Sequence, residues 1–490
     1  MTPRTFDAQH FVPETMWPYV RSLRLDCNFP RLVYERNAVG RKPLNGYDAI
    51  YSALTAKLTS MPKLRTMIIS HAQKGGLPWE AISAVVRIPQ LRSLHIVGFL
   101  DDRPVLPPET ERLLHPLITS LATIDYPSSG YRRISATEIK LFSVLLRQAT
   151  TQRSLEILSI PSECAPLDCL STTEFPRLRE LSLIGRRQVI TSHAGSGQRY
   201  TPYLSILAHM PRLRKLSLAL AQPIDLPRQE IWPAGMEAEF PCPDLQDLLV
   251  SYPHPDDEFY SHLPSTLKCL ALRCWPRHSF NFLEQDVSVM TGLGWYSPAP
   301  TSSEILRILR RCPPSSTGSV QRLELEFVED DQARELFRLI PGAFPQLRYL
   351  IIHRYRYYDR GSEMNAAVPV ATIAQALAPL QHLQALFCYL DFEHAPPPCA
   401  SDYSRFYTTL QRAADEFGNA LSSTVKVVGL LCRQRYGNRY VCFRIVRDDH
   451  GPGVHAECDR SPIVEIDGIS VDDGRAPRRE GMVGAVFVRQ

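Results

Sequence analysis

The sequence predicts an α/β solenoid, in which strand and helix units stack along one direction, and two observations support this prediction. One apolar phrase, an aromatic or aliphatic residue followed by Pro-x-Leu-Arg-x-Leu-x-Ile/Leu or a close variant, recurs along nearly the whole chain. The chain has 490 residues, whereas a single compact core usually stops growing at roughly 250 to 300 residues. A core that extends lengthwise accommodates both facts. The close copies of the phrase are 61–69, 88–96, 175–183, 210–218 and 344–352.

Looser copies keep only the apolar triplet Leu-x-x-Leu-x-Leu. This triplet is the strand signature of a leucine-rich repeat, whose period is roughly 20 to 29 residues. Successive first positions lie 27 residues apart (64 to 91, and 320 to 347) or 22 apart (245 to 267), and other spacings are longer, so the array is irregular. The looser copies begin at Val20, Leu155, Leu245, Leu267, Val320, Leu383 and Val425, and a weak one includes Ile118 and Leu121.

The spacing of the apolar residues also indicates how the units stack. One strand and its returning helix cannot bury their apolar faces alone, so neighbouring units pack together and their leucines form one continuous core. The alternation of strands and helices predicts parallel strands. We therefore expect about 12 irregular repeats in a ribonuclease-inhibitor-like horseshoe, with a parallel β-sheet on the concave face and helices on the convex face.

Helical segments are predicted between the strands. In 47–61, three apolar residues recur at intervals of four and so share one helix face. In 78–86 a proline opens the segment, where a first helical turn accepts it. Ser135 and Glu138 predict a capping box before 139–146, because each side chain can bond the other's backbone amide. The other predicted helices are 201–207, 303–309, 331–340, 370–377 and 401–423, and 439–446 alternates like a strand.

The pattern divides the chain into three parts. Residues 1–17 are a short N-terminal leader, residues 18–431 hold the repeats, and residues 432–490 are a C-terminal cap and tail. A cap is expected because the last repeat would otherwise expose its leucines and its strand edge. Residues 273–319, rich in Pro, Ser and Trp, are either one irregular repeat or a protruding loop.

Composition favours an intracellular protein without a strongly charged partner. The net charge is +4, and hydrophobic residues make up 44% of the chain. No signal peptide is visible, and no apolar run reaches the roughly 18 residues that a membrane-spanning helix needs. The 12 cysteines are scattered without a Cys-x-x-Cys pair, which favours reduced thiols. We therefore expect a cytoplasmic or nuclear monomer with no membrane association, no nucleic-acid partner and no cofactor.

One segment suggests hydrolytic chemistry. Residues 252–258, Tyr-Pro-His-Pro-Asp-Asp-Glu, follow an apolar run and resemble the metal motif of the zinc-dependent N-deacetylases. The resemblance implies that His254 and an aspartate bind zinc and that a carboxylate acts as base, and these groups suit a hydrolytic zinc site. In that family the motif lies near the N-terminus and precedes a Gly-rich helix start, whereas here Phe-Tyr-Ser-His follows in mid-chain. A zinc-dependent hydrolase is the alternative interpretation, and a polar loop after a repeat strand is the main one.

Two further polar groups also have simple interpretations. His450, His455 and Cys458 could meet at a metal, but three scattered donors are more often surface residues. Residues 354–360, Arg-Tyr-Arg-Tyr-Tyr-Asp-Arg, combine basic and aromatic side chains as nucleic-acid surfaces do, but such a surface also needs a basic excess. Neither group changes the expectation of a protein that binds no metal and is not an enzyme.

The chain also resembles a known group of proteins. The resemblance lies in the repeat phrases, in 251–277 with Leu-Pro-Ser-Thr-Leu-Lys-Cys-Leu at 263–270 and Arg-Cys-Trp-Pro-Arg at 273–277, and in the opening Trp-Pro-Tyr-Val-Arg-Ser-Leu-Arg-Leu at 17–25. At these residues the chain is similar to F-box or leucine-rich-repeat proteins of mushroom-forming fungi (basidiomycetes), over roughly 15–400.

This resemblance implies a function. In that group an N-terminal F-box docks on the Skp adaptor of a cullin ubiquitin ligase, and the repeats hold the protein substrate. The residues before Trp17 are too few for an F-box. We therefore expect a substrate receptor or scaffold of F-box-like type that binds a protein partner of unknown identity and does not itself bind the adaptor.

The repeat register predicts which residues face a partner. Side chains alternate along a strand, so the positions on either side of the second leucine face the concave surface. Towards the N-terminus these are mostly small or polar, such as Thr66, Ser93 and His95. Towards the C-terminus they become aromatic, as binding surfaces often are; the alternative is that the C-terminal cap covers them. The predicted binding residues are Tyr349, Ile351, His353, Tyr355, Arg356, Phe387 and Tyr389.

Overall fold

The computed structural model describes most of the chain and divides it into two compact units. The first unit holds the described residues from 13 to 188 together with 205–213, and the second holds 203–204 and those from 214 to 470. The described residues are 13–26, 46–70, 77, 79–98, 121–126, 136–188, 203–222, 227–228, 230–275, 277, 298–356, 368–393, 395–396, 400, 402–432, 439–447, 454–459, 465–466 and 469–470.

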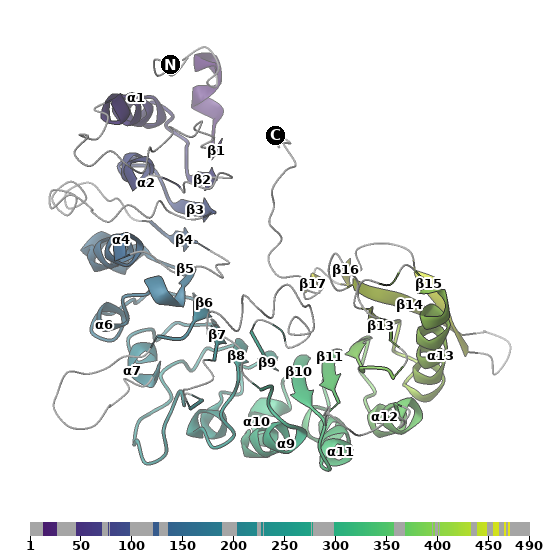
Figure 1. The fold of residues 1–490 in the computed structure, drawn as a ribbon. Coiled ribbons are helices and arrows are strands. Elements are labelled where there is room, and N and C mark those ends of the chain that lie inside the picture. Colours follow the sequence, from purple (N-terminus) through teal and green to yellow (C-terminus); the bar gives the residue numbers. More distant parts are fainter. Residues whose placement is uncertain are drawn as a thin grey trace, which may run out of the picture. The chain divides into compact units, whose positions relative to one another are not determined.

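The first unit is a run of parallel strands in chain order, with helices along one side (Figure 1). Each predicted triplet in this part of the chain is a strand. The strands are β1 (Ser22–Asp26), β2 (Thr66–Ser70), β3 (Ser93–Val97), β4 (Thr123–Asp125), β5 (Ile157–Pro161) and β6 (Glu180–Arg186). The helical elements are η2 (Glu14–Tyr19), α1 (Gly46–Thr59), α2 (Trp79–Val86), α4 (Ala136–Arg147), α5 (Ala149–Ser154), η3 (Ser162–Cys164) and α6 (Leu167–Leu170), and α7 (Tyr203–Leu207) follows along the chain.

The second unit continues the same pattern and ends differently. Strands β7 to β13 are parallel, and β14 and β15 then pair antiparallel with β13 and with each other. The strands are β7 (Lys215–Ala221), β8 (Asp247–Ser251), β9 (Cys269–Arg273), β10 (Arg322–Val328), β11 (Tyr349–Tyr355), β12 (Ala385–Tyr389), β13 (Val427–Cys432), β14 (Arg439–Arg447) and β15 (Val454–Asp459), with a small pair β16 (Glu465–Ile466) and β17 (Ile469–Ser470). The helical elements are η4 (Glu258–His262), α9 (Ser302–Arg311), α10 (Pro314–Thr317), α11 (Ala333–Ala343), α12 (Val370–Leu377) and α13 (Ser404–Ala420).

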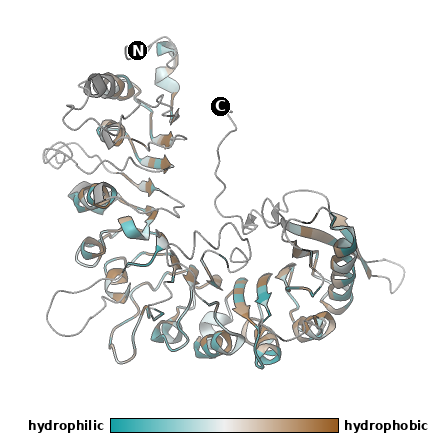
Figure 2. Ribbon diagram, viewed as in Figure 1, coloured by the Kyte–Doolittle hydropathy of each residue, from teal (hydrophilic) through white to brown (hydrophobic). Residues whose placement is uncertain are grey.

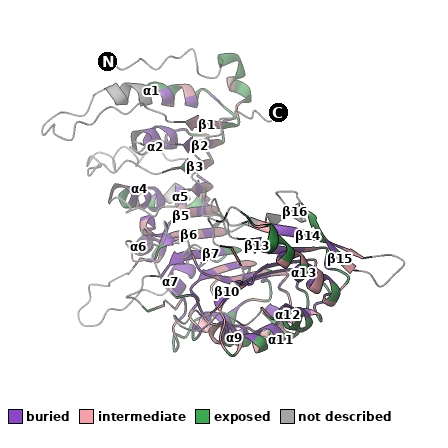
Figure 3. Cartoon of the chain, turned by 45° about the vertical axis from the view of Figure 1, so that its right-hand side comes forward, coloured by how far each residue is buried: buried purple, intermediate pink, exposed green. Residues whose placement is uncertain are grey.

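The apolar triplets form the core because alternate residues of each strand turn towards the helices. In β2 the side chains of Met67 and Ile69 are fully buried, and in β10 those of Leu323 and Leu325 are as well. Figure 2 shows the strands as largely hydrophobic, with hydrophilic bands on β10 and β11. Figure 3 shows buried residues along the strands and exposed residues on the helices, for example on α13. Both units are therefore α/β leucine-rich-repeat solenoid segments, as the sequence predicts.

Hydrogen bonds that repeat from unit to unit hold neighbouring strands in register. The carbonyl oxygen of Arg65 accepts from the backbone N–H groups of Arg92 (2.8 Å) and Ser93 (2.9 Å). The same pattern occurs in the second unit, where the carbonyl of Gln246 accepts from Lys268 and Cys269. Where the residue before a strand takes two bonds from the next repeat in this way, a shift of one residue would lose both and would also turn the leucines outward.

Side chains before the strands add to this registration. The amide nitrogen Nε2 of Gln90 donates to the Met61 carbonyl (2.8 Å), and the Thr266 hydroxyl donates to the Leu245 carbonyl (2.8 Å). Each side chain reaches back to the loop of the preceding repeat. The Met61 carbonyl also accepts from the backbone N–H of Leu64 (3.1 Å), so these side chains add to the backbone bonds of the loops.

Two sequence interpretations are refined by the structure. The weak copy begins at Leu121, one triplet position later than predicted. Its core residues are Leu121, Ile124 and Tyr126, all buried around β4. The tyrosine in place of the third leucine made this copy hard to recognise. In the 273–319 segment, β9 pairs directly with β10, so its described residues add helices α9 and α10 but no strand. The capping box predicted at Ser135 falls partly outside the described residues, and Glu138 is buried and accepts a hydrogen bond from the Tyr126 hydroxyl (2.9 Å).

The C-terminal end of the second unit is closed by antiparallel strands and a long helix. The alternating segment predicted at 439–446 is β14, and α13 packs against β13, β14 and β15. A parallel strand at the end would offer its free edge to other chains, and the β13–β15 meander removes β13 from that position. Within the described residues, no helix has the length and apolar character to cross a membrane.

Candidate functional site

The sheet face turned away from the helices, here called the open face, is partly exposed in the first unit. In β2, Thr66 and Ile68 are half-buried, whereas the intervening Met67 is fully buried. The same alternation holds in β3, where Ser93 and His95 are half-buried. The open face of the first unit therefore presents side chains to the surroundings, as the repeat register predicts for its N-terminal positions.

The parallel register arranges these side chains in rows across the strands. One row runs from Ile68 through His95 and Asp125 to Ser159. His95 Nδ1 lies 3.1 Å from Asp125 Oδ2, and both side chains are about one third exposed (32% and 33%). A carboxylate at this distance favours the tautomer with the proton on Nδ1, which leaves Nε2 as an acceptor. The row offers polar and apolar contacts side by side.

In the second unit the predicted binding residues are buried, so their expected exposure is wrong. Tyr349 is 7% exposed and Phe387 2%, and His353 and Tyr355 are fully buried. Ile351 and Tyr389 are buried as well, whereas Arg356 is half-buried and forms an ion pair with Glu393 (2.7 Å). A role of these residues in binding stays a prediction, but it would need the covering groups to move first.

The cover is supplied in part by the antiparallel strand β14, in line with the alternative that the C-terminal segment covers the aromatic residues. Tyr440 on β14 lies edge to face with Phe387, with ring centroids 5.2 Å apart, and its hydroxyl lies 2.8 Å from His353 Nε2. Phe387 in turn leans over Gly429 of β13, whose missing side chain makes room for the ring. Tyr349, Ile351 and Phe387 form one buried cluster with Cys442.

A group of polar and charged side chains, most of them buried, is here called the Glu324 cluster: Glu324, Glu326, His353 and Tyr355, with Arg273 and Arg277. Glu324 contacts Arg277 Nη2 and lies 3.2 Å from Arg273 Nη1. Glu326 accepts from the Tyr355 hydroxyl (2.9 Å) and from the backbone N–H of Cys274 (3.0 Å), and lies 3.5 Å from Arg277 Nη1.

The charges in this cluster are coupled. Burial opposes the ionisation of Glu324, but the guanidinium groups of Arg277, Arg273 and Arg322 outweigh it and hold the pKa of Glu324 well below its usual range. Burial and the charge of Arg277 lower the pKa of His353 well below its usual value, so its imidazole is neutral. Nδ1 of His353 is buried and has no hydrogen-bond partner among the described residues.

The sequence reasoning missed the Glu324 cluster. Its signal was the charged alternation in Arg-Leu-Glu-Leu-Glu at 322–326, where two glutamates occupy open-face positions of a strand. Such an alternation is usually read as a solvated face. Here the two carboxylates are buried, and the loop after β9 places Arg277 against both of them, a contact that the local pattern does not reveal.

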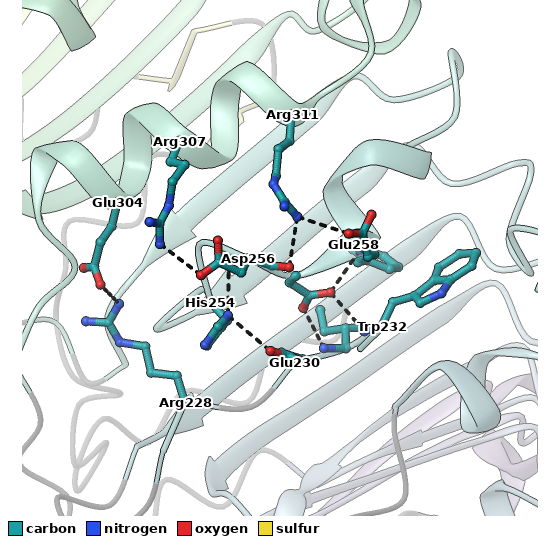
Figure 4. A network of polar contacts seen from close by, with 12 residues as sticks. Arg228, Glu230, Trp232, His254, Asp256, Glu258, Glu304, Arg307 and Arg311 are labelled. Carbon is teal, nitrogen blue, oxygen red and sulfur yellow. Dashed lines mark hydrogen bonds and ion pairs between the residues drawn. The ribbon is translucent and has the colours of Figure 1, made fainter. Parts of the chain in front are cut away.

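The segment that resembles a deacetylase motif has a structural role (Figure 4). Asp257 is buried, and its carboxylate accepts from the backbone N–H groups of Ile231 (2.6 Å), Trp232 (3.0 Å) and Phe259 (3.0 Å). It thus caps η4 and fastens the 231–232 loop. Burial raises the pKa of Asp257 to about 6, against the three N–H donors that favour its charged form.

The other acidic groups of this segment face arginines on α9 (Figure 4). Asp256 Oδ2 lies 3.1 Å from Arg307 Nη2, and Glu258 Oε1 lies 3.6 Å from Arg311 Nη1. His254 Nδ1 accepts from the backbone N–H of Asp256 (3.2 Å). Because Asp256, Glu258 and His254 each contact a different partner, their side chains do not converge on a common metal position.

Metal ligation therefore finds no support in the described part of the chain. No group of three or more His, Cys, Asp or Glu side chains there could hold a metal ion. Of the other candidate donors, His455 lies beside Glu457 (3.3 Å), Cys458 is exposed, and His450 falls outside the described residues. In the basic and aromatic segment, Arg354 pairs with Glu329, and residues 357–360 are not described.

Comparisons with known proteins find only remote structural likenesses. No protein-family model and no curated protein matches the sequence. Among solved structures, the chain is similar to the crystal structure of a TLR13–ssRNA13 complex, with a TM-score of 0.29 and 13% identity over 86% of this chain and 64% of that one. It is also similar to the leucine-rich-repeat-containing protein LegL7 from Legionella pneumophila, with a TM-score of 0.21 and 11% identity over 84% of each chain. The chain thus spans less than two thirds of the TLR13 chain, and likenesses at these scores carry no argument about ligands.

Proposed function

We propose that this protein is a non-enzymatic protein-interaction module and that the open face of its first unit holds the partner. The observation that carries this proposal is the partial exposure of the residues between the core positions of β2 to β5, in rows set by the strand register. A sheet face of this kind offers a partner a broad surface of mixed polar and apolar groups. The corresponding face of the second unit around β10 to β12 is buried.

A finer proposal follows from the resemblance to fungal F-box and leucine-rich-repeat proteins. The module would act as a substrate receptor or scaffold of F-box-like type, linked to ubiquitin ligase function in the cytoplasm or nucleus. Gel filtration of the purified chain with the Skp adaptor tests the link. We expect no complex of the two alone, and a stoichiometric complex would show that the chain joins the ligase directly.

The binding face is tested with two matched substitutions of isoleucine. Ile68 is half-buried on the open face, and Ile139 is 40% exposed on α4. A partner is first identified by crosslinking in cell extract and then purified. Ile68→Arg should weaken its binding by at least about 2 kcal/mol, the scale of a binding hot spot. Ile139→Arg should leave the affinity unchanged.

The same pair of variants controls for folding. Both variants should keep a melting temperature close to that of the wild type, because neither position belongs to the fully buried core. Equal affinities of Ile68→Arg and wild type for the purified partner would refute the assignment of this face.

A further inference from the structure

The Glu324 cluster contains more buried charge than a strand of a repeat array needs. Glu324 is 2% exposed, Glu326 is fully buried, and both belong to β10. A buried carboxylate is costly unless it is paired and hydrogen-bonded. Arg277 supplies much of the pairing, because its guanidinium reaches both carboxylates and is itself 5% exposed.

Arg277 is not part of the sheet that it neutralises. Strand β9 ends at Arg273, and β9 pairs directly with β10. Arg277 lies four residues further along, in the segment between these two strands that adds no strand in its described part. A side chain of the connecting segment therefore lies against two carboxylates of the open face.

The geometry around Arg277 suits a guanidinium group in particular. Nη2 contacts Glu324 Oε1 and Nη1 lies 3.5 Å from Glu326 Oε2, so two nitrogens of one planar group serve two carboxylates. A lysine ammonium is a point charge and cannot span two acceptors in this fixed fork. The neighbouring His353 Nδ1, fully buried and without a hydrogen-bond partner in the described chain, is a further polar atom on this face.

We propose that the Glu324 cluster is an arginine-recognition site that Arg277 occupies in the isolated chain. A partner protein that presents an arginine would take the same place when Arg277 leaves it. The part that concerns the partner rests on the proposed protein-interaction function. The guanidinium site itself does not, because Arg277 already fills it.

Chemical rescue tests the site without any partner. Arg277→Ala leaves Glu324 and Glu326 without this guanidinium and should lower the melting temperature. Millimolar methylguanidinium should then raise the melting temperature in a saturable way and recover at least half of the loss, because a ligand that binds only the folded state stabilises it. Methylammonium at the same ionic strength should recover none.

Two control chains fix the location of the effect. The wild type should show no saturable shift with methylguanidinium, because Arg277 fills the site. Arg277→Ala combined with Glu324→Gln should also show none, because one of the two carboxylates is gone. If Arg277→Ala does not fold alone, the same comparison uses the yield of folded protein on refolding with methylguanidinium or methylammonium.

The outcomes separate the two proposals. An equal response to methylguanidinium and methylammonium, or no response in Arg277→Ala, would overturn the arginine site and leave the open face of the first unit untouched. A selective rescue supports the site, and the tripeptide acetyl-Gly-Arg-Gly-amide should then stabilise Arg277→Ala more than its lysine counterpart. A peptide effect that does not distinguish arginine from lysine would overturn recognition of a partner's arginine.

Discussion

Gly429 offers a sharp test of the packing that covers the aromatic residues. A Cβ atom built on Gly429 would lie 2.7 Å from Cε1 of Phe387 and closer still to Cδ1. Carbon atoms pack best at about 3.5 to 4.0 Å, so the ring must move by at least about 1.2 Å to admit a methyl group. Phe387 has little room for this, because it is 2% exposed and lies against Tyr440.

The expected cost of Gly429→Ala follows from these contacts. Overpacking a filled core typically costs about 1 to 3 kcal/mol. The lower backbone entropy of alanine in the unfolded chain returns about 0.4 to 1 kcal/mol, since Gly429 has no positive φ. We therefore expect a net loss of about 1 to 2 kcal/mol in the free energy of unfolding. The Tyr440 hydroxyl contact with His353 should weaken with it.

Urea denaturation followed by circular dichroism measures this loss, with two comparisons. Gly342→Ala on α11 is the matched control, because nothing lies within 4 Å of the added methyl group, and it should stabilise slightly. In a Phe387→Leu background the same Gly429→Ala change should cost less, by a coupling of about 1 kcal/mol. An effect of Gly429→Ala within about 0.5 kcal/mol of wild type, or one that is unchanged by Phe387→Leu, would refute the packing described here.

Three further predictions concern the buried residues and the deacetylase-like segment. The folded state raises the pKa of Asp257 from 3.8 to about 6, so it binds the proton more tightly than the unfolded chain does. The free energy of unfolding should therefore fall by up to about 3 kcal/mol as pH rises from 4 to 6. Asp257→Asn should flatten this part of the profile of urea midpoint against pH, and an unchanged slope would contradict the assignment. Elemental analysis should find no stoichiometric zinc, and one zinc per chain that is lost in His254→Ala would revive the hydrolase interpretation. Tyr349→Ala with Phe387→Ala should lower the melting temperature strongly, because each truncation of a buried aromatic costs about 3 to 5 kcal/mol; a melting temperature close to that of wild type would mean that both rings are exposed.

The repeat phrase predicts the fold well because it records local packing. Each Leu-x-x-Leu-x-Leu copy sets which side chains enter the core. The backbone N–H groups at the start of one strand donate to the carbonyl just before the neighbouring strand, and these bonds depend only on the strand register. The prediction is wrong by one triplet position at β4, where the leucine pattern is interrupted. Tyr126 fills the third core position there, and its hydroxyl is satisfied by Glu138, a partner that no local pattern reveals.

The candidate site was harder to predict because it depends on contacts between residues far apart in the sequence. The register correctly places Phe387 on the open face, but its exposure depends on Tyr440 and Gly429, more than 40 residues further along the chain. The contacts of the acidic segment at 254–258 could not be predicted for the same reason. Its carboxylates are used by backbone amides at 231–232 and by arginines on α9, and neither partner lies within the motif.

The proposed binding face follows from a contrast between the open faces of the two units. In the first unit the half-buried residues between core positions can contact a partner without rearrangement, and the side chains of His95 and Asp125 are each about one third exposed (32% and 33%). In the second unit a partner must first displace side chains that satisfy buried charges, so binding there would be slow or would need a compensating arginine. Substitution of Ile68 should therefore slow the association of a partner more than substitution of Arg277 does.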